Sequence, residues 1–280
     1  MLPESLAGVP VTALGVALIR AGETQRPDRL FDDPYAELFV RAAEPEFTGP
    51  DASPQARATW ETLQRLAPAM TARAVSVRRL QDYLLGAVSA GCTQIVELGA
   101  GLDTYAFRLP WAEPCRYFEI DLPQMFGFKE QVLASHTASA DRRVVPADIE
   151  ADWWERLTAA GFDDRESTAW LDGGVLDYLP RRRVHAVLNR IVAAAAPGSR
   201  YACVLPAQVT GATGSGIAAI TGASKAAQRP ATGFGPDLAD WLSERGWQVE
   251  VQSQADAAAY YRRSLPEDGS GGGYLTARLP

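Results

Sequence analysis

A short turn with two glycines is the segment whose residue types could best bind a small molecule. Residues 96–104 read Val-Glu-Leu-Gly-Ala-Gly-Leu-Asp-Thr, which places Gly99 and Gly101 directly after an apolar run. Glycines there let the backbone bend tightly and approach a ligand without a Cβ collision. No third glycine follows at the spacing of a G-x-G-x-x-G motif, and this disfavours a pyrophosphate cradle. Glu97, just before the turn, could orient the loop or face a cationic ligand.

Acidic residues also stand at the ends of the next two apolar runs. Residues 118–121 read Phe-Glu-Ile-Asp, and an acid at the tip of a second strand, here Asp121, is placed to accept hydrogen bonds from ribose hydroxyls. Asp148 and Ile149 end a third run and suit the amino edge and apolar face of an adenine. Open α/β sheets bind ligands at the carboxyl ends of their strands, so we expect these groups to converge. The alternative is that the acids only cap helices.

The elements that must position these residues follow from the spacing of apolar side chains. Up to about residue 85 the chain has helical spacing, and from residue 94 short apolar runs alternate with helical patterns, which is typical of a parallel sheet. The expected strands are 94–98, 116–120, 143–146, 168–171 and 200–205, with two more near 247–251 and 274–278. The expected helices between them are 123–134, 152–160, 180–196 and 236–246.

This pattern predicts two regions within one α/β unit. Residues 1–90 are expected to form an N-terminal helical cap packed on the core, and residues 91–280 the ligand-binding α/β core. Residues 207–236 are rich in Gly, Ala, Ser and Thr and are long enough to act as a lid inserted over a site. A surface insertion without that role is the alternative, and the sequence does not separate the two.

Composition and charge narrow the classes of partner. The 280 residues carry a net charge of −7 with an isoelectric point near 5.0. Nucleic-acid binding needs a concentrated basic surface, so we expect no nucleic-acid partner. The run Arg181-Arg182-Arg183 is the cationic cluster of note and is expected to form a solvated helix start rather than a phosphate site.

Cysteines, histidines and the N-terminus indicate the compartment. Cys92, Cys115 and Cys203 are odd in number and form no CxxC pair, which favours reduced thiols in a cytosolic protein. His136 and His185 lack partners at metal-ligand spacing, so no metal site is expected. The mildly apolar N-terminal stretch is too short to span a bilayer and is expected to be an amphipathic helix. We therefore expect a cytoplasmic protein that does not bind membranes.

Several segments together carry a more specific pattern. In chain order they read TALGVALIRAGETQRPDRLFDDPYAELF, ELGAGLDTYAFRLPW, RYFEIDLPQ, VPADI and TAWLDGGVLDYLP. They cover nearly the whole chain and resemble the leucine carboxyl methyltransferase-like family. These are bacterial O-methyltransferases related to the enzyme that methylates a protein C-terminal carboxyl group.

The resemblance implies a fold, a cofactor and several site residues. The fold is that of class I methyltransferases, a Rossmann-like seven-stranded sheet with its last strand antiparallel and a helical cap at the N-terminus. The cofactor is S-adenosyl-L-methionine. By motif, Gly99 carries over to the turn on the methionine side, Asp121 to the ribose, and Asp148 with Ile149 to the adenine.

Two departures from the family pattern concern charged residues. The family usually has an Arg-Thr pair whose arginine grips the methionine carboxylate, but this chain has Ser76-Val77 in that register. Arg73 and Arg78 lie nearby, and either would present a fork suited to a carboxylate. The fourth strand typically ends Ala-Glu-Gly, but here Asp172-Gly173-Gly174 follows it, so the acid near the sulfonium is either displaced to Asp172 or lost.

A third departure concerns the glycine turn. The family usually continues Asp-Thr-Arg, whereas this chain reads Asp103-Thr104-Tyr105. All three departures surround the methionine and methyl end of the expected pocket, while the adenosine end keeps the family pattern. The predicted cofactor-binding residues are Arg73, Arg78, Glu97, Gly99, Gly101, Asp103, Glu119, Asp121, Leu122, Asp148, Ile149 and Asp172.

The leading functional hypothesis is an O-methyltransferase that acts on a carboxylate or hydroxyl of a small molecule, such as a secondary metabolite. Tyr105 and Asp172 are the candidate catalytic residues, and Asp177 and Tyr178 could also line the site. A carboxylate acceptor needs no base, whereas a hydroxyl benefits from one. The altered methyl end motivates two alternatives: a repurposed fold that catalyses a non-methylating reaction such as cyclisation, or a non-catalytic scaffold that binds the cofactor. The sequence leaves the acceptor and the oligomeric state open.

Overall fold

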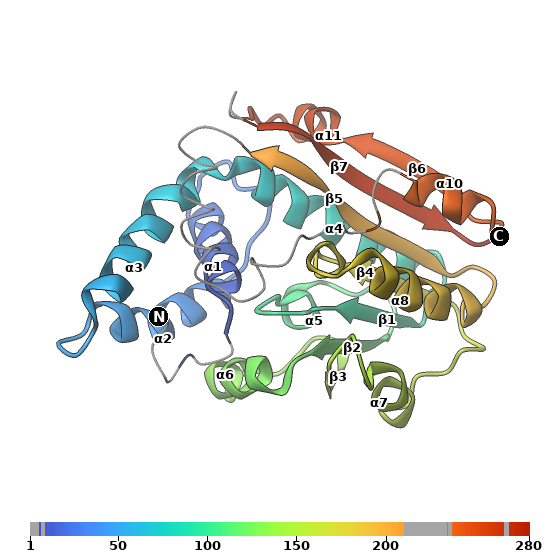
Figure 1. Ribbon diagram of the computed structural model, residues 1–280, viewed down its shortest axis with the longest axis horizontal. Helices are drawn as coiled ribbons and strands as arrows, with labels where there is room; N and C mark the ends of the chain where they lie inside the picture. Colours follow the sequence, from blue (N-terminus) through green and yellow to red (C-terminus); the bar gives the residue numbers. More distant parts are fainter. Residues whose placement is uncertain (1–5, 7–8, 210–233, 235–236, 266–268) are drawn as a thin grey trace.

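A seven-stranded sheet organises the protein in the computed structural model, which describes residues 6, 9–209, 234, 237–265 and 269–280. The strands are β1 (Gln94–Leu98), β2 (Arg116–Asp121), β3 (Asp141–Pro146), β4 (Thr168–Asp172), β5 (Arg200–Val209), β6 (Gln248–Ser253) and β7 (Gly269–Arg278). Their order is β3-β2-β1-β4-β5-β7-β6, and β7 runs antiparallel to both of its neighbours while β1–β5 pair in parallel (Figure 1). This confirms the expected sheet with an antiparallel last strand.

Helices precede the sheet and fill its crossovers. Before β1 come α1 (Val11–Thr24), α2 (Ala36–Thr48), α3 (Pro54–Leu66), the short 3₁₀ helix η2 (Ala67–Ala69) and α4 (Thr71–Ser89). After it come α5 (Tyr105–Arg108), α6 (Pro123–Leu133), α7 (Trp153–Ala159), η3 (Leu176–Tyr178), α8 (Arg181–Ala193), α10 (Leu238–Ser243) and α11 (Gln254–Tyr260). The expected helices and strands are present, with ends shifted by a few residues; the expected strand near 274–278 extends back to Gly269.

The two faces of the sheet are covered by different helices, because successive strand residues point to opposite sides. Ile95 and Tyr117 pack on the face that also receives α4 and α6 and the cap. Val96 and Phe118, one position further along their strands, pack on the other face with α7, α8 and α10. Both faces are therefore apolar, as a parallel sheet buried between helices requires.

The N-terminal helices share a hydrophobic core with the sheet. Figure 1 shows α1, α2 and α3 gathered on the left of the sheet, and their buried side chains join the cluster that contains Ile95 and Tyr117. Within the cap, Phe47 stacks on Trp60 with ring centroids 5.0 Å apart. This arrangement agrees with a cap packed on the core, and the division at residues 90 and 91 remains a prediction. The expected lid at 207–236 lies mostly outside the described residues.

A buried arginine ties the cap to the glycine turn. Arg20 of α1 is 1% exposed, and its Nε lies 3.1 Å from Asp33 Oδ2. Its Nη1 donates to the Asp103 carboxylate and its Nη2 to the Leu102 carbonyl, both in the turn that follows β1. Asp33 lies just before α2, and its Oδ1 accepts a hydrogen bond from the N–H of Ala36, the first residue of that helix, at 3.2 Å. The position of the turn therefore depends on the cap.

We predict that Arg20→Met lowers the free energy of unfolding by about 3–5 kcal/mol, because Asp103 loses its partner and the buried Asp33 carboxylate keeps only the guanidinium of Arg108, whose Nε is 3.7 Å away. Urea unfolding followed by circular dichroism measures this change. Arg41→Met is the control, since Arg41 pairs with Glu37 at 2.6 Å on the surface and such pairs contribute only about 0.3–0.5 kcal/mol. Equal losses of unfolding free energy in the two variants would contradict the proposed importance of the buried Arg20 contacts.

Candidate cofactor site

The two glycines of the turn have different surroundings. Gly99 and Gly101 have φ values of +66° and +49°, a backbone region that other residues rarely adopt. A Cβ at Gly99 would lie 2.5 Å from Cβ of Val175, in the loop after β4, so this glycine is required for packing. At Gly101 the space is open, and the nearest atom to a built Cβ is the Gly99 carbonyl oxygen at 3.9 Å. A ligand could therefore come close to the backbone at Gly101, whereas at Gly99 the space is occupied by Val175.

Asp121 faces this turn from the end of β2. Its Oδ2 accepts a hydrogen bond from Gly101 N at 2.7 Å, and its Oδ1 accepts one from Leu122 N at 2.7 Å. Burial raises the pKa of Asp121, while these two backbone donors oppose the increase. Each carboxylate oxygen keeps a lone pair after these bonds. The side chain is thus held in place and can still accept hydrogen bonds from a diol.

The third predicted element lies on the adjacent strand. Asp121 pairs in register with Pro146 of β3, and Asp148 and Ile149 follow two and three residues later. Asp148 is exposed, and its Oδ1 accepts a hydrogen bond from Glu150 N at 2.8 Å. Ile149 is half-buried, and Leu122 is an exposed large hydrophobic residue. Carboxylates and apolar side chains thus lie together at the carboxyl ends of β2 and β3.

Of the two arginines proposed for the methionine carboxylate, only Arg73 reaches the strand ends. Its Nη1 and Nη2 each lie 3.3 Å from the Gly173 carbonyl oxygen, and its buried Nε has no hydrogen-bond partner. Arg78 points elsewhere: it pairs with Asp82 at 3.0 Å and donates to the Leu30 carbonyl at 2.7 Å. The structure therefore brings Arg73 to the site and leaves Arg78 outside it.

Asp172 is directed into its own loop rather than into an open site. It is 3% exposed, and its Oδ1 accepts hydrogen bonds from the backbone N–H groups of Gly174 and Val175, both at 2.8 Å. Burial raises its pKa to about 6, against the opposing effect of these donors. The carboxylate holds the turn after β4, and Gly173 has no side chain where the family has an acid. This geometry favours a structural role over the catalytic role suggested by the sequence.

Tyr105, the other catalytic candidate, lies in the core. Its side chain is 2% exposed, its hydroxyl donates to the Val77 carbonyl at 3.2 Å, and the Arg108 guanidinium lies 5.0 Å from its ring centroid. Burial raises its pKa to about 12. Ser76, which occupies the family's arginine position, shares a 2.9 Å hydrogen bond with the Tyr274 hydroxyl. Neither side chain is presented to a substrate.

Glu97 and Glu119 form a buried pair instead of lining the site. They face each other in register across β1 and β2, and both are at most 1% exposed. Lys129 and Arg142 each lie 2.8 Å from Glu119 Oε2, and although burial opposes them, they lower the pKa of this carboxyl. Glu97 Oε2 accepts a hydrogen bond from the Tyr117 hydroxyl at 2.9 Å. Glu119 is therefore engaged by two cations within the core, and its role in cofactor binding stays a prediction.

The pKa of Glu97 is raised to about 8, first by burial and then by the negative charge of Glu119. Glu97 Oε1 is buried and has no hydrogen-bond partner. A neutral carboxyl group at this position avoids placing two adjacent negative charges in the core. Glu97 thus acts on the site only indirectly, as a buried residue of the strand that ends at Leu98, just before Gly99.

Asp103 and Arg20 show what the sequence reasoning missed. Asp103 was expected to contact the cofactor, and the structure shows it paired with Arg20 from the cap. Arg20 was not identified at all. A signal was present, because Arg20 continues the three-residue spacing of the apolar Leu14 and Ala17 on the buried face of α1. A charge on such a face indicates a buried partner.

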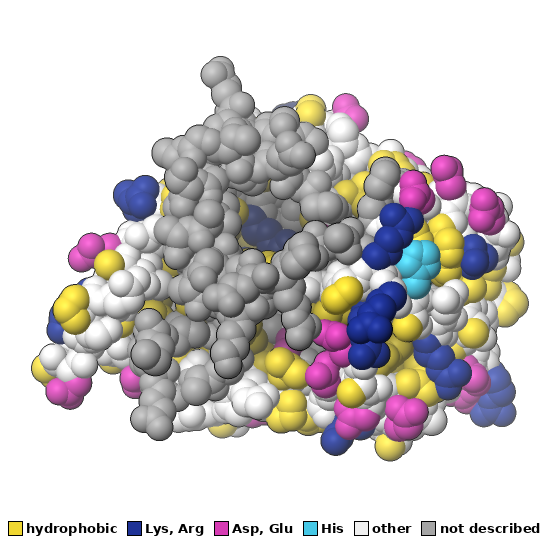
Figure 2. Space-filling model, in the orientation of Figure 1, with side chains coloured by type: hydrophobic (Ala, Val, Ile, Leu, Met, Phe, Trp, Pro, Cys, Tyr) yellow, Lys and Arg dark blue, Asp and Glu magenta, His cyan; other side chains and the backbone are white. Residues whose placement is uncertain are grey.

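The outer surface and the rest of the described chain add two observations. On the right of Figure 2, basic and acidic side chains alternate instead of forming a broad area of one sign. Among the residues the structure describes, no helix is long and apolar enough to cross a membrane, and no three His, Cys, Asp or Glu side chains are grouped to hold a metal ion.

We predict that stability depends on pH through Glu97. The folded protein binds this proton more tightly than the unfolded chain does, so folding is progressively disfavoured as the pH rises from about 4.5 to about 8. Glu97→Gln removes this dependence and should be more stable than wild type by on the order of a few kcal/mol at pH 8, with a smaller difference at pH 5. Urea unfolding at several pH values gives the free energy of unfolding of both proteins as a function of pH. If the difference between the two proteins does not change with pH, Glu97 does not titrate in this range.

Comparison with known proteins agrees with this geometry. A family model described as leucine carboxyl methyltransferase matches residues 13–192. A protein of Frankia alni is 40% identical over 267 residues, which cover 94% of this chain and 92% of that protein. A protein of Rhodococcus jostii is 40% identical over 277 residues, which cover 94% of this chain and 91% of that protein. Both carry the name "Putative S-adenosyl-L-methionine-dependent methyltransferase".

The fold is also found in solved structures. A "putative methyltransferase" from Thermobifida fusca aligns with a TM-score of 0.53 at 17% identity, covering 90% of this chain and 94% of that one. At this identity the likeness shows the class I methyltransferase fold alone. Because the family model matches more than half of the chain and the relatives are 40% identical over most of it, the chain belongs to the leucine carboxyl methyltransferase family.

Proposed function

We propose that the protein is an S-adenosyl-L-methionine-dependent O-methyltransferase acting on a carboxylate or hydroxyl of a small molecule. The observation that carries this proposal is the carboxylate of Asp121, fixed by Gly101 N at 2.7 Å beside an open glycine turn. The family and the names of its relatives support the cofactor and the reaction type. The choice of a small acceptor is our own inference.

The described side chains fit the parts of the cofactor. Arg73 has a buried Nε without a partner and only long hydrogen bonds from its two Nη atoms, so its guanidinium can take up a carboxylate as a bidentate pair. Asp121 would accept hydrogen bonds from the ribose hydroxyls, and Asp148 with Ile149 would receive the adenine. These residues lie on α4, β2 and the loop after β3, at or beside the carboxyl ends of the strands.

The protein's own contribution to the reaction is alignment and exclusion of water. When bound, the cofactor supplies a methyl group on a sulfonium that already provides the driving force. Arg73 and Asp121 would fix the amino-acid carboxylate and the ribose, on either side of the sulfonium, and so set the direction from which an acceptor oxygen must approach. A carboxylate acceptor is already ionised and needs no base. For a hydroxyl, Asp177 in η3 is the candidate proton acceptor, because burial and the charge of Asp172 raise its pKa to about 7.

The methyl end also supports a second candidate function, a non-methylating reaction on the same fold. Gly173 presents no carboxylate and Ser76 is hydrogen bonded to Tyr274, so two charged groups typical of the family are absent. Arg73 could replace the missing arginine, and no described side chain replaces the missing acid at position 173. Incubation with methyl-labelled cofactor and an extract of small molecules separates the candidates: transfer of the label supports methylation, and binding without transfer favours the second candidate or a non-catalytic scaffold.

We predict that Asp121→Ala weakens binding of S-adenosyl-L-methionine by about 1–3 kcal/mol, because charge-assisted hydrogen bonds to the ribose are lost. Isothermal titration calorimetry measures the dissociation constant. Asp141→Ala is the control, since Asp141 is an exposed aspartate at the opposite end of the neighbouring strand β3. An unchanged affinity in Asp121→Ala would show that the ribose assignment is wrong.

The two arginines of α4 give a matched pair for the carboxylate end. Arg73→Gln should weaken cofactor binding at least about tenfold, because a buried carboxylate loses its charged partner. Arg78→Gln should leave the affinity within about twofold of wild type, because Arg78 is engaged by Asp82 and Leu30. The same titration tests both variants, and the reverse order of effects would mean that Arg78 holds the carboxylate.

A further inference from the structure

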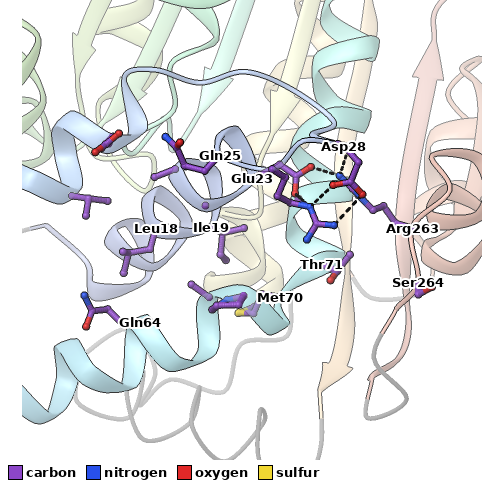
Figure 3. Close-up of a pocket in the computed structure, with 18 of the residues that line it drawn as sticks. Leu18, Ile19, Glu23, Gln25, Asp28, Gln64, Met70, Thr71, Arg263 and Ser264 are labelled. Atoms are coloured by element: carbon purple, nitrogen blue, oxygen red, sulfur yellow. Dashed lines mark hydrogen bonds and ion pairs between the residues drawn. The ribbon is translucent and has the colours of Figure 1, made fainter.

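A large cavity in the cap is not explained by the cofactor site. It has a volume of about 1000 Å³, at the upper end of the range for small-molecule pockets. Its described walls come from α1, α2, the end of α3, η2, the start of α4 and the turn after α11 (Figure 3). None of the residues predicted to bind the cofactor is among these lining residues.

Two helices separate this cavity from the glycine turn. On α1 the lining is centred on Leu18, Gly22 and Gln25, which are spaced four and three residues apart, and it extends to Ile19 and Glu23. Arg20, which binds the glycine turn, is rotated about 200° from Leu18 and is not among the lining residues. On α4, Thr71 and Ala74 line the cavity, while Arg73 is directed to Gly173. The cavity is therefore a site distinct from the strand ends.

The cavity has an apolar part and a charged part. In Figure 3, Leu18, Ile19 and Met70 lie around one side, and Val40, Ala67, Pro68 and Ala74 add to the apolar lining. On the other side, Arg263 donates to the carboxylates of Glu23 and Asp28. A ligand that fills this space must carry an apolar body and a polar end.

The sign of that polar end follows from the ion pairs. The described lining includes four arginines and three carboxylates. Arg41 pairs with Glu37 at 2.6 Å, Arg26 with Asp28 at 3.0 Å, and Arg263 with both Glu23 and Asp28. The guanidinium of the fourth arginine, Arg262, has no hydrogen-bond or ion-pair partner among the described residues, and the residue is exposed.

The backbone conformation of Arg262 is set by the end of α11. Its φ of +55° is the one positive value among the described non-glycine residues. This is a Schellman helix end, because Arg262 N donates to the Ala259 carbonyl at 3.0 Å and Arg263 N to the Ala258 carbonyl at 2.8 Å. Arg262 is thereby held in one backbone conformation where the chain leaves the helix. It stands beside Arg263 and Ser264, which also line the cavity. The charged side of the cavity thus includes one unpaired guanidinium, that of Arg262, while the other three arginines of the described lining are paired with carboxylates.

We propose that this cavity binds a small amphipathic monoanion, with an apolar body against Leu18, Ile19 and Met70 and a single carboxylate paired with Arg262. The single charge matches the one arginine of the described cavity lining that lacks a carboxylate partner. The site is independent of the cofactor and of the proposed methyl transfer, so its ligand and S-adenosyl-L-methionine can be bound together.

Titration of the full-length protein with sodium decanoate tests this proposal. We expect a dissociation constant on the order of 1 mM or below for decanoate and at least about tenfold weaker binding of 1-decanol, which lacks the charge. Saturation with S-adenosyl-L-methionine should leave the decanoate affinity within about twofold. Absence of decanoate binding, or competition between the two ligands, would overturn the proposal of a separate site.

Glycine variants locate the ligand. A Cβ at Gly22 meets no atom within 4 Å and Gly22 lines the cavity, so Gly22→Leu should fill the space without disturbing the fold. This variant should weaken decanoate binding at least about tenfold. Gly86→Leu is the matched control, because Gly86 is also helical with open space around it but lies outside the cavity lining. Equal decanoate affinities in the two variants would overturn the proposal.

Arginine variants test the charge. Arg262→Gln should weaken decanoate binding at least about tenfold and leave 1-decanol binding unchanged, since only the ion pair is lost. Arg29→Gln is the control, because Arg29 is exposed and does not line the cavity. Unchanged decanoate binding in Arg262→Gln, with normal thermal stability, would contradict the role of Arg262.

Discussion

The guanidinium of Arg20 is the interaction on which the arrangement of the site depends. It is buried between Asp33, which lies just before α2, and the Asp103 carboxylate and Leu102 carbonyl of the glycine turn. A buried charge is tolerated only when it is paired and hydrogen bonded, so the cap and the turn must hold each other in one geometry. Asp121 is in turn connected to the glycine turn, because its carboxylate accepts a hydrogen bond from Gly101 N. The cap is in this sense part of the cofactor site, although it contributes no predicted cofactor ligand before α4.

Sequence reasoning succeeded where the signal is local. The parallel strands, the glycine turn and the acids at the strand ends follow from patterns of a few residues, and the sheet order then brings Gly101, Asp121 and Asp148 to one edge. It did not predict the direction of side chains that have distant partners. Glu119 is paired in the core with Lys129 and Arg142, and the Tyr105 hydroxyl donates to the Val77 carbonyl. None of these partners could be assigned from spacing. Arg20 and the cavity beside it depend in the same way on packing between helices.

The two halves of the site differ in how far they follow the family. The adenosine half keeps its carboxylates and its open glycine, whereas the methyl half has a glycine at position 173 and a serine at 76. Arg73 reaches this half from a different position on α4 than the family arginine, and so restores a positive charge with a different geometry. Asp172 meanwhile holds the loop after β4. Such a pocket can keep the cofactor while changing what it does with the acceptor.

A crystal structure of the protein with S-adenosylhomocysteine tests the central claim most directly, because it places both halves of the cofactor at once. We predict that the ribose hydroxyls lie within hydrogen-bond distance of the Asp121 carboxylate and that the amino-acid carboxylate meets the guanidinium of Arg73. A ligand bound with its ribose away from Asp121, or no ligand at the carboxyl ends of β1 and β2 at saturating concentration, would contradict the account.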